Sequence, residues 1–312
     1  MAVSVRIASR VGPWTRLPAY AGLSRPATWL AVRGVRPDLP RDATLLVGLV
    51  VGIAFAAGGF AKPVDAVVYW QAGTSSALYP QSWAECCEGH LFYPPPIAQL
   101  STMLQPLGWQ VFVILLTVAI FASVWYCARA WSLPILAAGI PYYLGIGPDL
   151  PATFLSYALL GNIQWILAAL TVVAFRQPAA YALLALSKMT SGIGWLWLIF
   201  RREWQAAGVA AGTTIMVVAV SFVLAPDLWF EFVGFMARNA SMADPPLPLF
   251  PIPFPIRLAG AAALIAWGAP RNHRWVVPIA SGFAIPALWG LGFLPFIVAA
   301  TRLVDRRPAS RS

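Results

Sequence analysis

An aspartate and a tyrosine, one helical turn apart, follow a long uncharged run. The run TLLVGLVVGIAFAAGGF is followed by AKPVDAVVYW, which holds Asp65 and Tyr69. In a helix, residues four apart lie on one face, so both side chains are expected to point into one pocket. A carboxylate in a partly desolvated cleft at a membrane surface is suited to act as a general base. The alternative is a solvated carboxylate at the end of a helix.

A proline-rich segment supplies the next candidate. FYPPPIAQL (92–100) places Tyr93 before three prolines. A proline disfavours the α conformation in the residue before it and is tolerated in the first turn of a helix. We therefore expect an extended Tyr93 and a helix that begins at the prolines. The segment is either a rigid wall that carries Tyr93 toward a substrate or a stiff loop.

Lys188 lies in SKMTSG (187–192), in the middle of an apolar block. A lysine at the centre of a bilayer costs on the order of 3 kcal/mol on insertion scales. It cannot reach the polar boundary near Arg201, which lies 13 residues further on, about 20 Å along a helix. Lys188 is therefore expected to face a cavity and an anionic partner, either a phosphate or Asp65 itself.

Three more polar residues are candidates for substrate binding. Asn162 and Gln164 stand in LLGNIQWILAAL (159–170), where they either bind sugar hydroxyls or form hydrogen bonds between helices. Arg238 is a further cation available to a phosphate group. Glu85, Glu88 and His90 form either a metal site or, as we favour, a solvated acidic loop, so no metal ligand is assigned.

The composition predicts a membrane protein. Of 312 residues, 60% are hydrophobic and 10% charged, with a mean hydropathy of +0.72, whereas soluble domains hold about 25% charged residues. The 21 Lys and Arg exceed the 11 Asp and Glu. These cations stand in short connectors and at the termini, which favours a role in membrane topology over binding of nucleic acid.

Apolar blocks between charged connectors predict an all-α, polytopic bundle. The expected spans are 43–61, 108–128, 132–147, 153–175, 206–225 and 256–269. Two more blocks, 178–200 and 275–300, are interrupted at 187–192 and 284–290. Helices broken inside a membrane usually line a cavity, because the freed backbone groups need partners.

The positive-inside rule sets the expected orientation. With a cytoplasmic N-terminus, 17 of the 21 basic residues lie on the cytoplasmic side. Two long loops, 62–107 and 226–255, then face the periplasm or exterior, and Asp65 lies in the first of them. We expect a basic cytoplasmic tail at 1–42, a transmembrane domain at 43–304 and a second basic cytoplasmic tail at 305–312.

Several of these motifs together resemble glycosyltransferase family 87, the membrane α-mannosyltransferases of the GT-C superfamily. The resemblance is carried by Asp65 and Tyr69, LYP at 78–80, FYPPPIAQL and the later Pro106-Leu107. LLGNIQWILAAL resembles the family's Gly-Gln-x-Asn helix start with the two amides in swapped order. ALLALSKMTSGIGWLWLIFRREW (182–204) resembles its helix with a mid-membrane lysine. The match covers about 43–205; the proline usual after the lysine and the later outward-facing histidine are not found.

The resemblance implies a GT-C-like bundle of roughly 8–10 transmembrane helices with no nucleotide-sugar site. It implies a polyprenyl-phosphate-linked sugar, mannose in the family, as donor and a glycan or glycolipid as acceptor. Asp65 would act as the base of an inverting transfer, with Lys188 and Arg238 at the leaving phosphate. Tyr69, Tyr93, Asn162 and Gln164 would bind the sugar.

Two other functions fit the same residues. Broken helices and a buried lysine also suit a transporter or flippase of a lipid-linked or anionic substrate. A non-catalytic membrane partner in envelope assembly is the third possibility.

Overall fold

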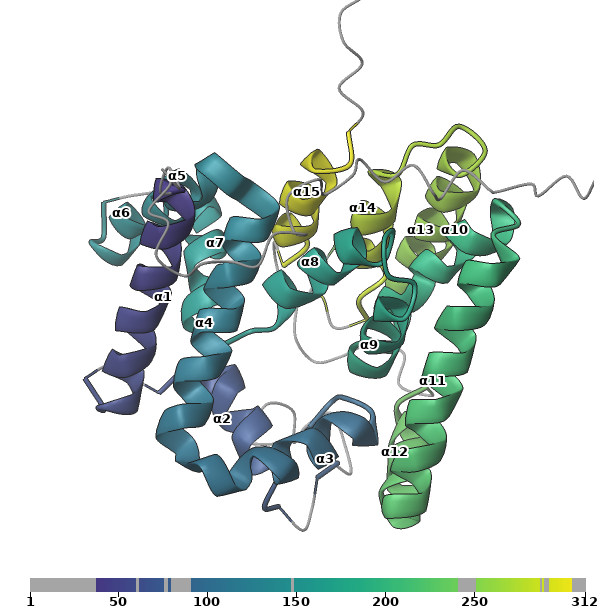
Figure 1. The fold of residues 1–312 in the computed structure, drawn as a ribbon, viewed down its shortest axis with the longest axis horizontal. Coiled ribbons are helices and arrows are strands. Elements are labelled where there is room, and N and C mark those ends of the chain that lie inside the picture. Colours follow the sequence, from purple (N-terminus) through teal and green to yellow (C-terminus); the bar gives the residue numbers. More distant parts are fainter. Residues whose placement is uncertain are drawn as a thin grey trace, which may run out of the picture. The chain divides into compact units, whose positions relative to one another are not determined.

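The computed structural model describes residues 38–59, 62–75, 78–79, 91–146, 149–240, 251–286, 288 and 292–304. Contacts join 38–312 into one unit, and all regular elements in its described residues are helices (Figure 1). The all-α prediction is confirmed for this part of the chain. The tails expected at 1–42 and 305–312 lie outside the described residues, except for 38–42.

Three helical segments are long and apolar enough to cross a membrane. They are α1 (Leu39–Ala56), the run Pro95–Tyr143 that contains α4 (Gly108–Ala128), and α11 (Trp204–Leu224). The bounds of α4 are those expected, whereas α1 begins four residues before the predicted 43. The reason is local: the Asp38 carboxylate caps the helix by accepting from Arg41 N, and Pro40 occupies the first turn.

Glycines allow α1 to lie closely against α4 (Figure 1). A Cβ built at Gly48 would lie 2.6 Å from the Cβ of Phe121, and one at Gly52 would lie 3.0 Å from the Cα of Ile114. Small residues at such a contact bring two apolar helices within packing distance, which is a common device in membranes. α1 is therefore fixed along α4 by shape complementarity.

The shorter helices confirm the two predicted breaks and interrupt two more of the expected spans. α9 (Ala180–Ser187) stops before the 3₁₀ helix η5 (Met189–Gly194) and α10 (Trp195–Phe200), and α14 (Val276–Phe283) is separated from α15 (Leu294–Thr301). The span expected at 132–147 forms two separate helices, α5 (Ser132–Ala137) and α6 (Ile140–Tyr143). The continuous span expected at 153–175 is wrong. The chain forms α7 (Asp149–Leu159) and α8 (Gln164–Val173), and between them Gly161 has φ +73°, a left-handed conformation that interrupts a helix.

The remaining elements complete the unit. They are α2 (Val64–Gln71), α3 (Pro95–Leu104), η3 (Gln105–Leu107), η4 (Arg129–Trp131), α12 (Pro226–Ala240) and α13 (Phe254–Gly268). The prediction that a helix begins at the prolines is confirmed, since α3 starts at Pro95. α2 contacts both α3 and α4 (Figure 1), so the segment that carries Asp65 is packed and helical.

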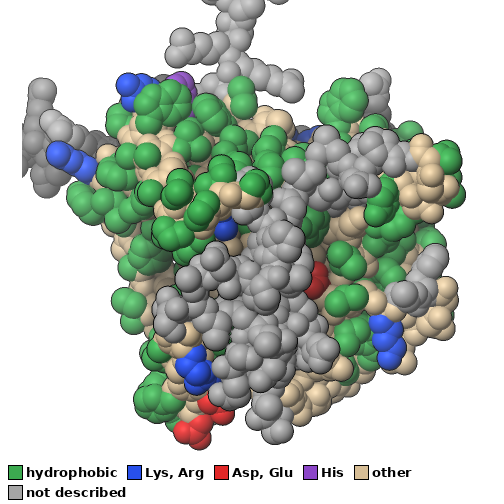
Figure 2. All heavy atoms as spheres, turned by 180° about the vertical axis from the view of Figure 1, so that it is seen from behind, with side chains coloured by type: hydrophobic (Ala, Val, Ile, Leu, Met, Phe, Trp, Pro, Cys, Tyr) green, Lys and Arg blue, Asp and Glu red, His purple; other side chains and the backbone are tan. Residues whose placement is uncertain are grey.

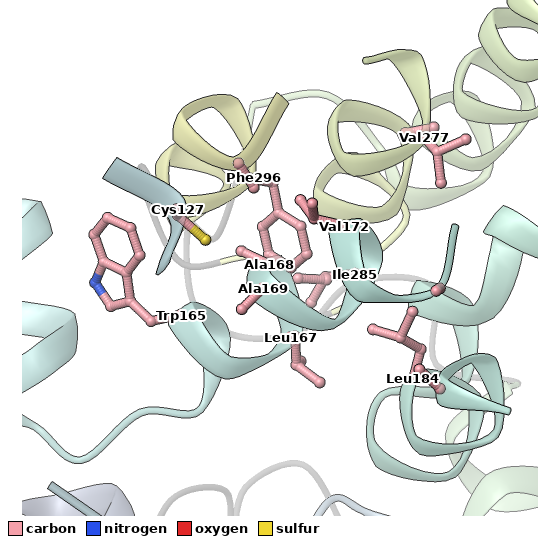
Figure 3. Packing of buried hydrophobic residues seen from close by; sticks show 14 of the residues in the cluster. Cys127, Trp165, Leu167, Ala168, Ala169, Val172, Leu184, Val277, Ile285 and Phe296 are labelled. Atoms are coloured by element: carbon pink, nitrogen blue, oxygen red, sulfur yellow. The ribbon is translucent and has the colours of Figure 1, made fainter. Parts of the chain in front are cut away.

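The main core lies where α8 meets α4, α9, α14 and α15. Trp165, Leu167, Ile285 and Phe296 are fully buried there, and the Cys127 thiol reaches the same cluster from α4 (Figure 3). The surface of α8 combines large side chains with alanines, so neighbouring helices can pack closely against several of its faces. The helix that follows Asn162 is therefore held on most of its surface.

Arg257 binds the backbone at the second predicted break. Its guanidinium donates to the carbonyl oxygens of Phe283, Ile285 and Pro286 at 2.7–2.9 Å, and Nε donates to Ile252 O at 3.0 Å. The first three of these carbonyls lie at or just after the end of α14, where no further helical turn supplies N–H donors to them. One buried side chain on α13 thus satisfies the break in another helix.

Much of the surface is apolar. Figure 2 shows hydrophobic side chains over much of one face, and on α11 Ile215, Met216 and Val223 are 67%, 60% and 80% exposed. Contiguous apolar surface of this kind marks an interaction with lipid or protein. Together with the three long apolar helices, it supports membrane association.

The close contact of α1 with α4 leads to a prediction. Gly48→Val should lower the thermal unfolding temperature of the purified protein, because the added side chain would overlap Phe121, and overpacking costs about 1–3 kcal/mol. Gly212→Val on α11 is the matched control, since a Cβ there meets nothing within 4 Å. Equal melting shifts for both variants would contradict the packing described here.

Candidate functional site

The first turn of α2 docks onto the break between α7 and α8. The Asp65 backbone N–H donates to Leu160 O at 3.0 Å. A Cβ at Gly161 would lie 2.8 Å from the Cβ of Ala66, so only glycine allows this approach. The break therefore brings the end of α7 directly onto the helix that carries Asp65.

Asn162 holds the Asp65 carboxylate from this break. Its Nδ2 donates to Asp65 Oδ2 at 2.8 Å, and its Oδ1 accepts from the Gln164 backbone N–H at 2.9 Å. The second bond fixes the amide orientation, because only the oxygen can accept from an N–H. Asn162 thus caps the start of α8 and presents its amino group to Asp65.

A pair of tyrosines lies next to this carboxylate. The hydroxyls of Tyr69 and Tyr93 are 2.9 Å apart, and the rings meet edge to face with centroids separated by 5.4 Å. Tyr79 donates from its hydroxyl to Tyr93 O at 3.1 Å. All three side chains are buried. The segment before α3 therefore places Tyr93 against Tyr69, a contact that the prolines alone do not predict.

Lys188 reaches the same cluster from the first broken block. It follows the last residue of α9 with an extended backbone, φ −116° and ψ 95°. Its Nζ lies 5.9 Å from the centroid of the Tyr93 ring, and its charge acts on Asp65. The break predicted at 187–192 thus directs the lysine to the predicted carboxylate.

Burial controls the protonation of the site. It raises the pKa of Asp65, while the hydrogen bond from Asn162 and the charge of Lys188 oppose this rise. Burial also raises the pKa of Tyr69 and of Tyr93, so both hydroxyls stay neutral at physiological pH. The site therefore combines a carboxylate of increased basicity, a cation and two neutral hydroxyl groups.

Gln164 is the first residue of α8, two positions after Asn162. A Cβ at Gly292 would come within 2.5 Å of the Tyr157 hydroxyl and 2.8 Å of Gln164 Oε1, so the backbone at Gly292 closes over both polar groups. Gln164 Oε1 is buried and has no hydrogen-bond partner among the described residues. Among the described residues Gln164 is linked to the cluster through its backbone N–H, which donates to Asn162 Oδ1.

The prediction that Arg238 contacts the donor phosphate stays a prediction. Arg238 lies on α12 with an exposed side chain, and the charged group that acts on Asp65 is Lys188. Glu85, Glu88 and His90 lie outside the described residues, within which no group of His, Cys, Asp and Glu could hold a metal ion.

Sequence reasoning missed Gly161 and Tyr157 and used Tyr79 only as part of a motif. Gly161 carried a signal, since glycine directly before a polar Asn162 marks a possible break in an apolar run. Tyr157 and Tyr79 carried none, because a lone tyrosine in an apolar segment is normally a core residue. No protein-family model matches the chain, and no curated protein or solved structure matches it significantly.

The electrostatics of Asp65 give a prediction for Lys188. Lys188→Met should raise the pKa of Asp65, because the variant removes the positive charge that favours its ionised form. Infrared absorption of the protonated carboxyl group, titrated with pH in reconstituted protein, measures this change, and Asp65→Asn identifies the band. The matched control is Lys62→Met, which removes an exposed lysine close to Asp65 in sequence. A pKa unchanged by Lys188→Met would show that the lysine does not face the carboxylate.

Proposed function

We propose that this chain is a membrane glycosyltransferase that transfers a sugar from a polyprenyl-phosphate donor to a glycan or glycolipid acceptor, with Asp65 as general base. The observation that carries the proposal is the convergence of Asp65, Tyr69, Tyr93, Asn162 and Lys188. These residues come from four separate segments and supply a base, a cation and sugar-binding groups in one cluster.

The reaction would be a single displacement at the anomeric carbon. Asp65 takes the proton of the acceptor hydroxyl as the oxygen attacks, and the bond from the anomeric carbon to the phosphate oxygen breaks with its electrons on the phosphate. One base and a good leaving group need no covalent intermediate, so the configuration is inverted. The hydrogen bond from Asn162 would keep the Asp65 carboxylate oriented while this carboxylate accepts the proton.

Lys188 would stabilise the charge that develops on the leaving polyprenyl phosphate. Its Nζ lies 5.9 Å from the centroid of the Tyr93 ring, and its charge acts on Asp65. Once Asp65 has taken the acceptor proton and lost its charge, the departing phosphate would replace the carboxylate as the anion that faces Lys188. The neutral hydroxyls of Tyr69 and Tyr93, and Gln164 Oε1 behind them, suit the hydroxyl groups of a sugar. Arg238, exposed on α12, is proposed as an outer contact for the donor phosphate.

We further propose a polytopic bundle of roughly 8–10 spans, and the contacts at the two ends of α11 support the proposed grouping of its connectors. Near the end of α11, Ser221 O accepts from Gln99 of α3 and Ser221 Oγ accepts from the Trp229 indole N–H of α12. The two segments expected outside therefore meet at that end. At the start of α11, Arg201 Nη1 donates to Ala269 O after α13, which joins two of the connectors expected in the cytoplasm.

The proposed base can be tested by activity. Membranes containing the protein would receive radiolabelled polyprenyl-phosphate-mannose and glycolipid acceptors, and Asp65→Asn should reduce transfer of label about 10²- to 10⁴-fold, the usual contribution of a general base. Asp227→Asn, which changes an exposed carboxylate on α12, should retain activity. Transfer that survives in Asp65→Asn would overturn the assignment. Donor translocation without transfer would favour a flippase.

The orientation can be tested separately. In a variant with serine at Cys86, Cys87 and Cys127, Asp227→Cys should react with a membrane-impermeant maleimide on intact cells. Arg271→Cys should react only after permeabilisation, because the two exposed positions are expected on opposite sides of the membrane. The reverse pattern would place Asp65 in the cytoplasm and remove the basis for an external donor.

A further inference from the structure

An apolar groove opens on the surface between α1, α4 and α8. Its volume is about 310 Å³, and its walls include Leu45 of α1, Trp125 and Tyr126 of α4, and Leu170 and Val173 of α8. The groove lies along two of the elements that carry candidate spans. It is separate from the Asp65 cluster, none of whose residues lines it.

Two arginines stand over the aromatic walls of this groove. The Arg129 guanidinium lies 4.5 Å from the Trp125 ring centroid and 5.5 Å from that of Tyr126. The Arg302 guanidinium, just past α15, lies 5.9 Å from the same Tyr126 ring. Both cations therefore share one aromatic residue that also lines the groove.

A third cation belongs to this group. Burial lowers the pKa of Arg302, and the positive charges of Arg129 and of Arg176, which follows the end of α8, lower it further, so Arg302 is repelled by both. The salt bridges of the described residues involve Arg41 and Arg201 instead. Within the described part of the chain, these three cations thus have no carboxylate to neutralise them.

The backbone at Arg129 is strained. Arg129 has φ 55° and ψ −123°, a combination that glycine adopts readily and other residues adopt at a cost of about 1–3 kcal/mol. A glycine at this helix end would serve the fold better. Glycine can therefore replace Arg129 without a backbone penalty, as it can replace Arg202, which has the same φ.

We propose that this groove and the cluster Arg129–Arg176–Arg302 form a binding site for an anionic phospholipid of the leaflet on the arginine-rich side. The phosphodiester would neutralise the guanidinium groups, and an acyl chain would occupy the apolar groove. A free phosphate ion would use only the cations and would leave the groove empty. The proposal rests on the membrane placement of α1 and α4 and is independent of sugar transfer.

The test compares two arginines with the same positive φ. Arg129 and Arg202 both have φ 55°, and Arg202 is exposed and is not part of the groove. Replacement by glycine should relieve strain at either position, so neither variant is expected to unfold. The full chain, purified in detergent, would be mixed with phosphatidylglycerol or phosphatidylcholine, and bound lipid would be counted by native mass spectrometry.

We expect Arg129→Gly to weaken binding of phosphatidylglycerol about five-fold, the effect of one basic residue near an anionic lipid surface. Arg202→Gly should bind as the parent does, and phosphatidylcholine should bind weakly to all three proteins. Equal loss in both variants, or equal binding of the two lipids by the parent, would overturn the site. Competition by millimolar inorganic phosphate that does not depend on the acyl chains would show a simple anion site instead.

Ala169→Trp provides an independent check of the groove, because Ala169 lines it and a larger side chain would fill it. This variant should lose phosphatidylglycerol while the three arginines are unchanged. Retention of the lipid together with an unchanged melting temperature would show that no acyl chain lies there.

Discussion

The candidate site depends on one constraint, which is that the ends of broken helices must find hydrogen-bond partners away from water. The break after α7 meets this requirement by receiving α2. Leu160 O accepts from the Asp65 backbone, and Asn162 binds both the Asp65 carboxylate and the first turn of α8. The same bonds that satisfy the break therefore hold the carboxylate in place, so structural stability and chemical positioning are not separate features of this region.

The polar residues of this site are easier to predict from the sequence than the contacts that bring them together. Asp65, Tyr69, Tyr93, Asn162 and Lys188 were identifiable because polar residues in apolar surroundings are costly and few. Their convergence was not predictable in detail, since it depends on contacts between segments nearly 100 residues apart. Arg238 shows the converse, because an exposed charge, here on α12, carries no such cost and hence little positional information.

The helix ends also fall into two groups, those predictable from local residues and those that depend on tertiary contacts. Proline and the SKMTSG stretch predicted where α3 begins and where α9 ends, because both act on the local backbone. The break at Gly161 escaped prediction since a single glycine within an apolar run is also compatible with a continuous helix. Its role becomes visible only with Ala66 against it. The position of α1 along α4 likewise follows from Gly48 and Phe121 as a pair, which neither residue reveals alone.

The bonds of Arg257 have a consequence for the order of synthesis. Arg257 lies in α13, whereas three of its acceptors lie at or after the end of α14 and emerge later from the ribosome. Until those residues have been synthesised, the Arg257 guanidinium lacks three of its later acceptors. Its transfer out of water within the apolar α13 would then be costly. In the proposed polytopic bundle, insertion of α13 on its own is therefore disfavoured, and α13 would enter the bilayer together with α14 as a helical hairpin.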